Sequence, residues 1–156
     1  MSASLPDREI MAVVSATDAL DLLLQRARTR LDRLHPVEAA AEVASGARLV
    51  DTRPEFQRRA DGDISGAIVI ERNHLEWRLH PESEGAIPEA TDLNLRWLVI
   101  CDEGYSSSLA AATLRLIGLR RATDVLGGFR AWRAAGLPVE RGVTPVSYTH
   151  LRARET

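Results

Sequence analysis

The sequence predicts an α/β domain with a mostly parallel sheet flanked by helices. Short apolar runs that are typical of buried strands alternate with longer segments that carry helical signals, and this alternation favours parallel strands. The chain has 156 residues, 45% of them hydrophobic, which suffices for one packed core. A net charge of −2 indicates neither nucleic acid nor a membrane surface as a partner, and no apolar run is long enough to span a membrane.

The N-terminal part of the chain contains two predicted helices. Residues 1–14 have no periodic pattern, so we expect them to be disordered. A serine–aspartate capping signal begins a predicted helix over residues 15–34, which places its leucines on one stripe. We interpret this segment as a structural helix docked on the domain, and a partner-binding helix is the alternative. The second helix has proline at its first position, Pro36, and ends at Gly46.

Strands and helices then alternate through a predicted domain at residues 35–141. The predicted strands are residues 47–50, 67–70, 95–100 and 122–126. Helical segments are predicted near Glu55, within the polar stretch 71–94, at 109–117 and from Phe129 to Ala135. Ligands of parallel sheets bind at the carboxyl ends of strands, and Cys101 follows such an end directly.

Cys101 is the only cysteine, and it lies between a predicted strand and a predicted helix. The turn that follows it consists of Asp102, Glu103, Gly104, Tyr105, Ser106 and Ser107. Inward-pointing backbone N–H groups and the helix N-terminus stabilise a thiolate, which is the nucleophilic form of cysteine. The pattern therefore predicts sulfur chemistry at Cys101, whereas a buried apolar thiol is the structural alternative. With a single cysteine and no signal peptide, we expect a reducing, cytoplasmic setting.

Four motifs, in family order, resemble those of a rhodanese domain, the sulfurtransferase fold. They are Leu49-Val50-Asp51-Thr52-Arg53, Gly62-Asp63-Ile64-Ser65-Gly66-Ala67, the loop from Cys101 to Ser106, and Gly127-Gly128-Phe129-Arg130-Ala131-Trp132 followed by Gly136-Leu137-Pro138. The resemblance covers about residues 33–140. It implies a three-layer fold without a cofactor or metal. It also implies that the cysteine takes a sulfane sulfur from a small donor or a protein persulfide, and passes it to a thiol or a cyanide-like acceptor.

Carried over to this chain, the resemblance makes Cys101 the nucleophile and the amides of residues 102–107 a cradle for its sulfur. Gly104 lets the loop curl without a Cβ clash, and the hydroxyls of Ser106 and Ser107 are expected to bond the thiolate or persulfide. The chain departs from the family at Asp63, where histidine is usual, and at Ser106, where many single-domain members have arginine.

The loop is acidic, which bears on the sulfur donor. Asp102 and Glu103 place two carboxylates near the sulfur, where they oppose an anionic thiolate and repel a dianion such as thiosulfate. Thiosulfate is therefore an uncertain donor. Asp51 and Arg53 are expected to form a structural ion pair that supports the end of the first strand, and a role as substrate ligands is the alternative. Tyr105 is expected at the rim of the pocket.

Three classes of function remain open at this point. The first is a sulfurtransferase or persulfide carrier, and the second is a rhodanese-like module that binds a partner with little turnover. The third, a cysteine-dependent phosphatase, needs a C-x5-R loop whose arginine clamps the phosphoryl group. No arginine follows Cys101 before Arg115, which disfavours the phosphatase and an arsenate reductase alike.

The C-terminal tail, residues 142–156, is treated apart from the domain. Its segment 146–156 has no apolar period and resembles an in-frame translation of a transposon-end adapter used in DNA library preparation. We therefore interpret 146–156 as non-native and exclude it from the fold prediction. A short disordered tail is the alternative.

Overall fold

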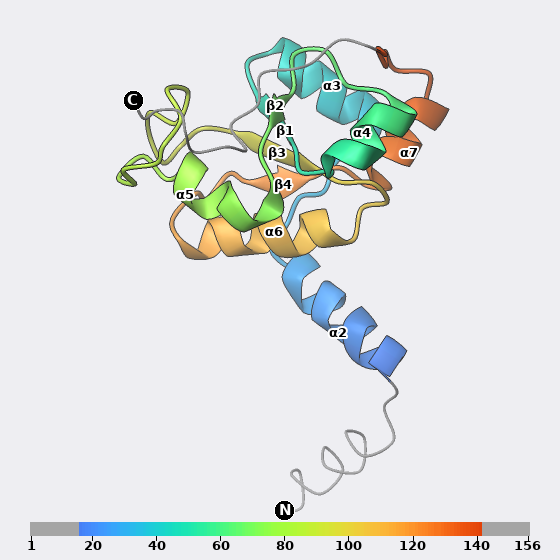
Figure 1. Cartoon of the computed structure of the whole chain (residues 1–156). Helices are drawn as coiled ribbons and strands as arrows, with labels where there is room; N and C mark the ends of the chain where they lie inside the picture. The colour runs from blue at the N-terminus through green and yellow to red at the C-terminus, as the bar shows by residue number, and fades with distance from the viewer. Residues whose placement is uncertain (1–15, 142–156) are drawn as a thin grey trace, which may run out of the picture.

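A sheet of four parallel strands forms the centre of the computed structural model, which describes residues 16–141 (Figure 1). The order of the strands is β2-β1-β3-β4, and every neighbouring pair is parallel, as the sequence predicts. The strands are β1 (Arg48–Asp51), β2 (Ile68–Val69), β3 (Trp97–Ile100) and β4 (Thr123–Asp124). The predicted disordered N-terminus at 1–14 and the predicted non-native tail at 146–156 lie outside the described residues.

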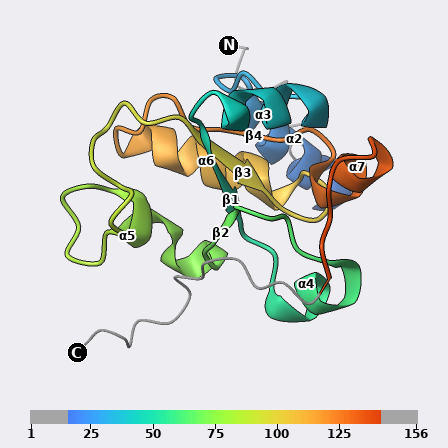
Figure 2. The same ribbon diagram turned by 90° about the horizontal axis from the view of Figure 1, so that it is seen from above.

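Helices cover both faces of this sheet, with α3 and α7 on one side and α5 and α6 on the other (Figures 1 and 2). The helices are α2 (Ala16–Arg28), α3 (Pro36–Ala44), α4 (Glu55–Asp61), α5 (Leu75–Leu79), α6 (Ser106–Leu116) and α7 (Gly128–Ala134), with a 3-10 turn at Arg72–His74. Among the described residues, no helix combines the length and the apolar character needed to cross a membrane.

The strands carry apolar side chains to both faces, because parallel sheets are buried on both sides. Leu98 and Ile100 of β3 pack in one cluster with Phe129 of α7. The alternate residues Trp97 and Val99 pack in a second cluster, which includes the buried apolar side chains of α6. The two separate cores give the three layers that the sequence predicts.

Helix α2 ends at Arg28, six residues before the end of the predicted helix at 34. The leucine stripe continues to Leu34, but the backbone there leaves the helix and joins the sheet. Leu34 N–H donates to the carbonyl of Asp124, and Leu126 N–H donates to the carbonyl of Leu34. Long-range pairing with the edge of the sheet thus overrides the local helical pattern.

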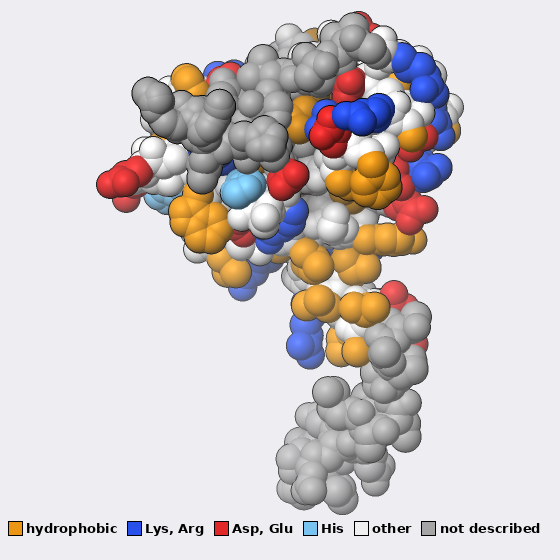
Figure 3. Space-filling model, viewed as in Figure 1, with side chains coloured by type: hydrophobic (Ala, Val, Ile, Leu, Met, Phe, Trp, Pro, Cys, Tyr) orange, Lys and Arg blue, Asp and Glu red, His pale blue; other side chains and the backbone are white. Residues whose placement is uncertain are grey.

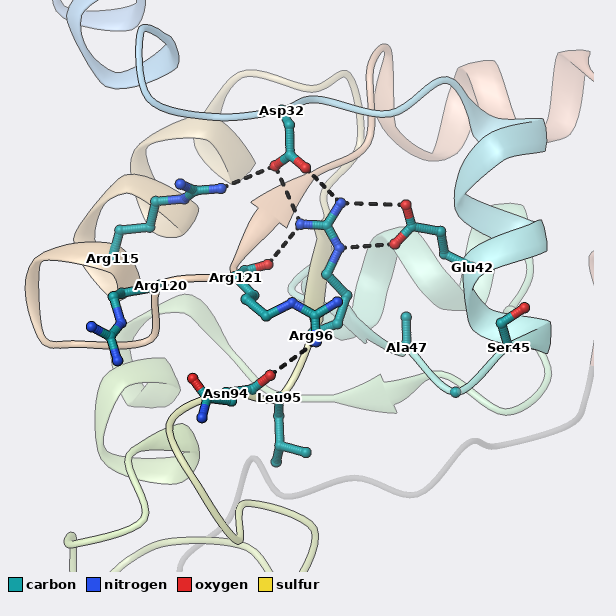
Figure 4. Close-up of a pocket in the computed structure, with 11 residues that line it drawn as sticks. Asp32, Glu42, Ser45, Ala47, Asn94, Leu95, Arg96, Arg115, Arg120 and Arg121 are labelled. Atoms are coloured by element: carbon teal, nitrogen blue, oxygen red, sulfur yellow. Dashed lines mark hydrogen bonds and ion pairs between the residues drawn. The ribbon is translucent and has the colours of Figure 1, made fainter.

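A network of charged groups ties four segments together at the amino end of β3 (Figure 4). The guanidinium of Arg96 lies 2.8 Å from Asp32 Oδ2 and 2.8 Å from Glu42 Oε1, and Arg115 Nη2 lies 3.0 Å from Asp32 Oδ1. Partial burial raises the pKa of Asp32, but the hydrogen bond and charge of Arg96 and the charge of Arg115 outweigh it, so the pKa lies below its usual value. Burial by itself lowers the pKa of Arg96. The hydrogen bonds and charges of Glu42 and Asp32 outweigh burial, so the pKa of Arg96 lies above its usual value.

The same network lines a cavity of about 570 Å³ at the amino end of β3, whereas Cys101 follows the carboxyl end of that strand. Each nitrogen of the Arg96 guanidinium donates to a protein oxygen, including Nη1 to the carbonyl of Arg121 at 2.8 Å. Because these donors are already used, we interpret the network as a structural tie between segments.

Candidate active site

Cys101 lies directly after β3 at the bottom of the predicted loop, with only 6% of its surface exposed. Its Sγ accepts hydrogen bonds from the N–H groups of Gly104, at 3.1 Å, and Ser107, at 3.3 Å. Helix α6 starts at Ser106, three residues earlier than the predicted helix, so its first turn belongs to the loop. Two of the amides in the predicted cradle therefore point at the sulfur, one of them from the first turn of α6.

A cavity of about 300 Å³ opens over the thiol. One wall is formed by residues 52–54 and Gln57, which connect β1 to α4 and begin that helix. The facing wall is the acidic loop, and it contributes Asp102, Glu103, Tyr105 and Ser106. The side chain of Tyr105 is exposed, as expected of a rim residue.

The curvature of the loop depends on a close approach to the turn before α7. Gly104 has φ +91°, and a Cβ at this position would lie 2.8 Å from the backbone nitrogen of Gly127. Gly128 has φ +61°, and a Cβ there would lie 2.6 Å from the carbonyl oxygen of Cys101. Both positions require glycine, because a side chain adds backbone strain to a contact that is already tight.

The first turn of α7 holds the cysteine loop through the backbone. Phe129 N–H donates to the carbonyl of Cys101 at 2.7 Å, and Arg130 N–H donates to the carbonyl of Asp102 at 3.1 Å. N–H groups at the start of a helix have no partner within the helix, so the loop supplies acceptors for them. The motif at 127–132 thus positions the cysteine although it lies 26 residues beyond it.

Arg130 also changes the charge of the acidic loop. Its Nε lies 3.0 Å from Asp102 Oδ2 and 3.9 Å from Glu103 Oε2. The hydrogen bond to Asp102 and the charge of that carboxylate raise the pKa of Arg130. In the sequence, Arg130 stands out only as part of a motif. Nothing in the local pattern indicates that it faces the carboxylates of Glu103 and Asp102, which lie 27 and 28 residues earlier in the chain.

Asp51 and Arg53 form a fully buried ion pair of 2.8 Å at the end of β1. Arg53 Nη2 also donates to the carbonyl of Gly62 at 2.8 Å, and its guanidinium lies 3.7 Å from the centre of the Phe129 ring. The pair therefore joins β1, the turn after α4 and the start of α7. Phe129 in turn holds the carbonyl of Cys101, so the pair supports the loop from below.

The hydroxyl of Ser107 does not bond the sulfur, contrary to the expectation from the resemblance. It donates to Asp124 Oδ2 at 2.7 Å, and the hydroxyl of Ser108 donates to the same oxygen at 2.8 Å. Asp124 is fully buried at the end of β4. Sequence reasoning missed it, because an acid at the end of a two-residue strand carries no local signal.

Asp63, at the position where the resemblance implies histidine, does not line the cavity over Cys101. Its backbone pairs with that of Glu140 in an antiparallel bridge, and its carboxylate lies 3.6 Å from Arg58. Asp63 therefore lies away from the cavity over Cys101 and pairs with the segment that follows α7.

Comparison with known proteins agrees with this architecture. The family model for the rhodanese-like domain matches residues 35–135. The thiosulfate sulfurtransferase GlpE of Pseudomonas entomophila is 36% identical over 102 residues, which cover 65% of this chain and 84% of that protein. A protein of unknown function from Rhodopseudomonas palustris, described as a possible tyrosine phosphatase, superposes with a TM-score of 0.71 at 32% identity, covering 78% of this chain and 93% of that one.

A polysulfide-sulfur transferase homodimer from Wolinella succinogenes has the same fold, with a TM-score of 0.63 at 21% identity over 88% of this chain and 93% of that one. The matched region contains the strand signature, the cysteine loop and most of the closing motif from which the sequence resemblance was drawn. The chain belongs to the rhodanese-like domain family, a family of sulfurtransferases.

Proposed function

We propose that this protein is a sulfurtransferase that carries a sulfane sulfur as a persulfide on Cys101. The observation that carries the proposal is the contact of Cys101 Sγ with the N–H groups of Gly104 and Ser107, at the base of a cavity open to small molecules. Donors aimed at a sulfur stabilise negative charge on it, both in the attacking thiolate and in the persulfide that replaces it.

With thiosulfate as the donor, the chemistry balances in two displacements. The Cys101 thiolate attacks the outer sulfur of thiosulfate, a new S–S bond forms, and the old S–S bond breaks with release of sulfite. A nucleophilic acceptor such as cyanide or a thiolate then attacks the outer sulfur of the persulfide. The Cys101 thiolate leaves, the acceptor keeps the sulfur, and the enzyme returns to its starting state.

By the same proposal, the sulfur donor in the cell is a small sulfane-sulfur compound or the persulfide of another protein. The acceptor is a thiol or a similar nucleophile, and the expected setting is the cytoplasm, where thiols stay reduced. Thiosulfate is the donor named for the relative in Pseudomonas entomophila. In this chain Asp102 and Glu103 oppose such a dianion, and Arg130 offsets part of their charge.

Intact-mass spectrometry tests the proposal. The protein is exposed in turn to thiosulfate, to mercaptopyruvate and to a cysteine-desulfurase system, and a gain of one sulfur on Cys101 identifies the donor class. Cys101→Ser is expected to abolish this gain and to leave the melting temperature essentially unchanged. Sulfur transfer that persists in the serine variant would refute the persulfide on Cys101.

The second candidate is a binding module with little turnover, and the acidic loop favours it. In that case the wild-type protein gains no sulfur from any of the three donors. A phosphatase is disfavoured, because the loop from Cys101 to the start of α6 contains no arginine to clamp a phosphoryl group. Hydrolysis of p-nitrophenyl phosphate that disappears in Cys101→Ser would reverse this assignment.

A further inference from the structure

We infer that Arg28 and Arg33 are positioning residues that hold the cysteine loop through the backbone carbonyl of Gly104. This inference deepens the proposed function and rests on it for its catalytic meaning. Both arginines precede residues 35–135, the part of the chain that the family model matches. Arg28 ends α2 and Arg33 lies in the connection to α3, so the N-terminal segment contributes directly to the sulfur cradle.

Arg28 bridges the loop and helix α6. Its Nη2 donates to the carbonyl of Gly104 at 2.8 Å, and its Nε donates to the hydroxyl of Ser108 at 2.9 Å. No ion pair joins it to a carboxylate within residues 16–141. Its positive charge lies against the carbonyl of Gly104, the residue whose N–H donates to Cys101 Sγ, so we expect it to favour negative charge on that sulfur.

Arg33 makes a similar pair of contacts, but one of its two partners is an acidic side chain. Its Nη2 donates to the same carbonyl of Gly104 at 3.0 Å, and its Nε donates to Asp124 Oδ1 at 2.8 Å. The other oxygen of Asp124 accepts the hydroxyls of Ser107 and Ser108. Arg33 thus completes the hydrogen bonding of a buried carboxylate that is bonded to the first turn of α6.

These contacts act on the two residues whose amides hold the sulfur. Gly104 donates its N–H to Cys101 Sγ while its carbonyl is fixed by two guanidinium groups. Ser107 donates its N–H to Sγ while its hydroxyl is fixed by Asp124. The carbonyl and the N–H of Gly104 belong to the two peptide planes that meet at its Cα, so anchoring the carbonyl plane limits the rotation of the most flexible residue in the loop.

The test compares three full-length variants with the wild type. Arg28→Met removes the charge and the forked donor but keeps an apolar stem, and Arg28→Lys keeps the charge without the fork. Arg26→Met is the matched control, since Arg26 lies exposed on the same helix and its side chain forms no hydrogen bond or ion pair with another residue of 16–141. The readout is the rate of Cys101 alkylation by iodoacetamide against pH, together with the melting temperature and sulfur transfer.

We expect Arg28→Met to move the midpoint of the alkylation profile to higher pH by roughly half a unit to one unit, which is about a three- to tenfold loss of reactive thiolate below the midpoint. Arg28→Lys should move it less, and Arg26→Met should leave it in place. A purely structural role lowers the melting temperature and leaves the midpoint unchanged, and this result would overturn the inference. Alkylation needs no sulfur donor, so a wild type inactive in sulfur transfer refutes the proposed function while this comparison still decides the role of Arg28.

Discussion

Arg130 pairs with the acidic residues of the cysteine loop, and under the proposed function this pairing limits how strongly they repel an anionic donor. Asp102 is only partly exposed and contacts the guanidinium directly, whereas Glu103 is more exposed and lies farther from it. The negative charge of Asp102 is therefore the better neutralised of the two. Glu103 contributes most of the repulsion that remains, although solvent screens it.

Replacing Glu103 by arginine should therefore improve the use of thiosulfate. The change removes a like charge beside the cavity and adds an opposite one, so we expect kcat/KM for thiosulfate to rise about two- to tenfold at low ionic strength. Arg130→Gln should change the same ratio in the opposite direction. The measurement is steady-state kinetics at two salt concentrations, and both effects should shrink at the higher one.

Glu84→Arg is a suitable control, because it makes the same change in net charge at an exposed position that does not line the cavity. Transfer from a protein persulfide should respond far less than transfer from thiosulfate. If Glu103→Arg and Glu84→Arg behave alike, the carboxylate of Glu103 has no influence on the donor.

Gly128 is the residue at which the loop and α7 come closest. We expect Gly128→Ala to lower the free energy of unfolding by about 1–3 kcal/mol more than Gly136→Ala does. Both glycines have positive φ, at +61° and +79°, but only a Cβ at Gly128 meets other atoms. Urea denaturation gives the free energy of unfolding of each variant. The difference between the two variants isolates the cost of the close contact at Gly128 from the cost of a positive φ. Equal losses would show that the loop relaxes away from the added methyl group.

At the scale of elements, the charged network at the amino end of β3 joins four segments that are far apart in the chain. Asp32 lies in the connection after α2, Glu42 in α3 and Arg115 in α6, and Arg96 directly precedes β3. The carboxylate of Asp32 bridges two arginines. The network requires the ionised form of Asp32, so its contribution to the free energy of unfolding depends on pH.

The pKa of Asp32 is lowered in the folded protein, which fixes the sign of this dependence. The stabilisation is present above the unfolded-state pKa of about 3.9 and is lost as the pH falls through the lower folded-state value. Asp32→Asn should therefore lower the free energy of unfolding at pH 7 by roughly 0.5–1 kcal/mol, a modest value because the carboxylate is half-exposed.

Urea titrations of this variant and the wild type between pH 7 and pH 3.5 check the prediction, and the difference between them should narrow toward the acid end. Asp21→Asn is the matched control, since Asp21 is exposed on α2 and its side chain forms no hydrogen bond or ion pair within the part of the chain that the structure describes. A difference that stays constant with pH would mean that Asp32 acts through hydrogen-bond geometry alone.

For the molecule as a whole, the sequence predicted what short-range patterns determine. Apolar runs such as 95–100 correctly indicated strands, and Gly104 was correctly expected where the backbone must curl. The start of α6 was placed three residues late, because Ser106 to Ser108 favour turns locally and become helical where Asp124 accepts two of their hydroxyls. Contacts of this kind join residues far apart in the chain, and one sequence contains no pattern that specifies them.

Helix α2 exposes an apolar face, which also concerns the molecule as a whole. Leu20 and Leu23 are 61% and 49% exposed, and Figure 3 shows apolar side chains along this helix where it extends from the body of the protein. The leucine stripe predicted a helix docked on the domain. In the structure α2 docks mainly through its C-terminal turn, where Arg28 reaches the cysteine loop.

The backbone bonds from Phe129 and Arg130 to the cysteine loop also set an order of events during synthesis. A ribosome delivers Cys101 before it delivers the residues that hold the carbonyls of Cys101 and Asp102. Until Arg130 has emerged, the strand that bears the thiol has no clamp, and the turn at 127–128 that shapes the loop does not exist. Since domains fold as units, the loop around Cys101 can reach its folded shape only when nearly the whole domain is available. The shape of the cysteine loop is in this sense completed late in translation, and a chain that stops before Phe129 contains the cysteine without the residues that hold its loop.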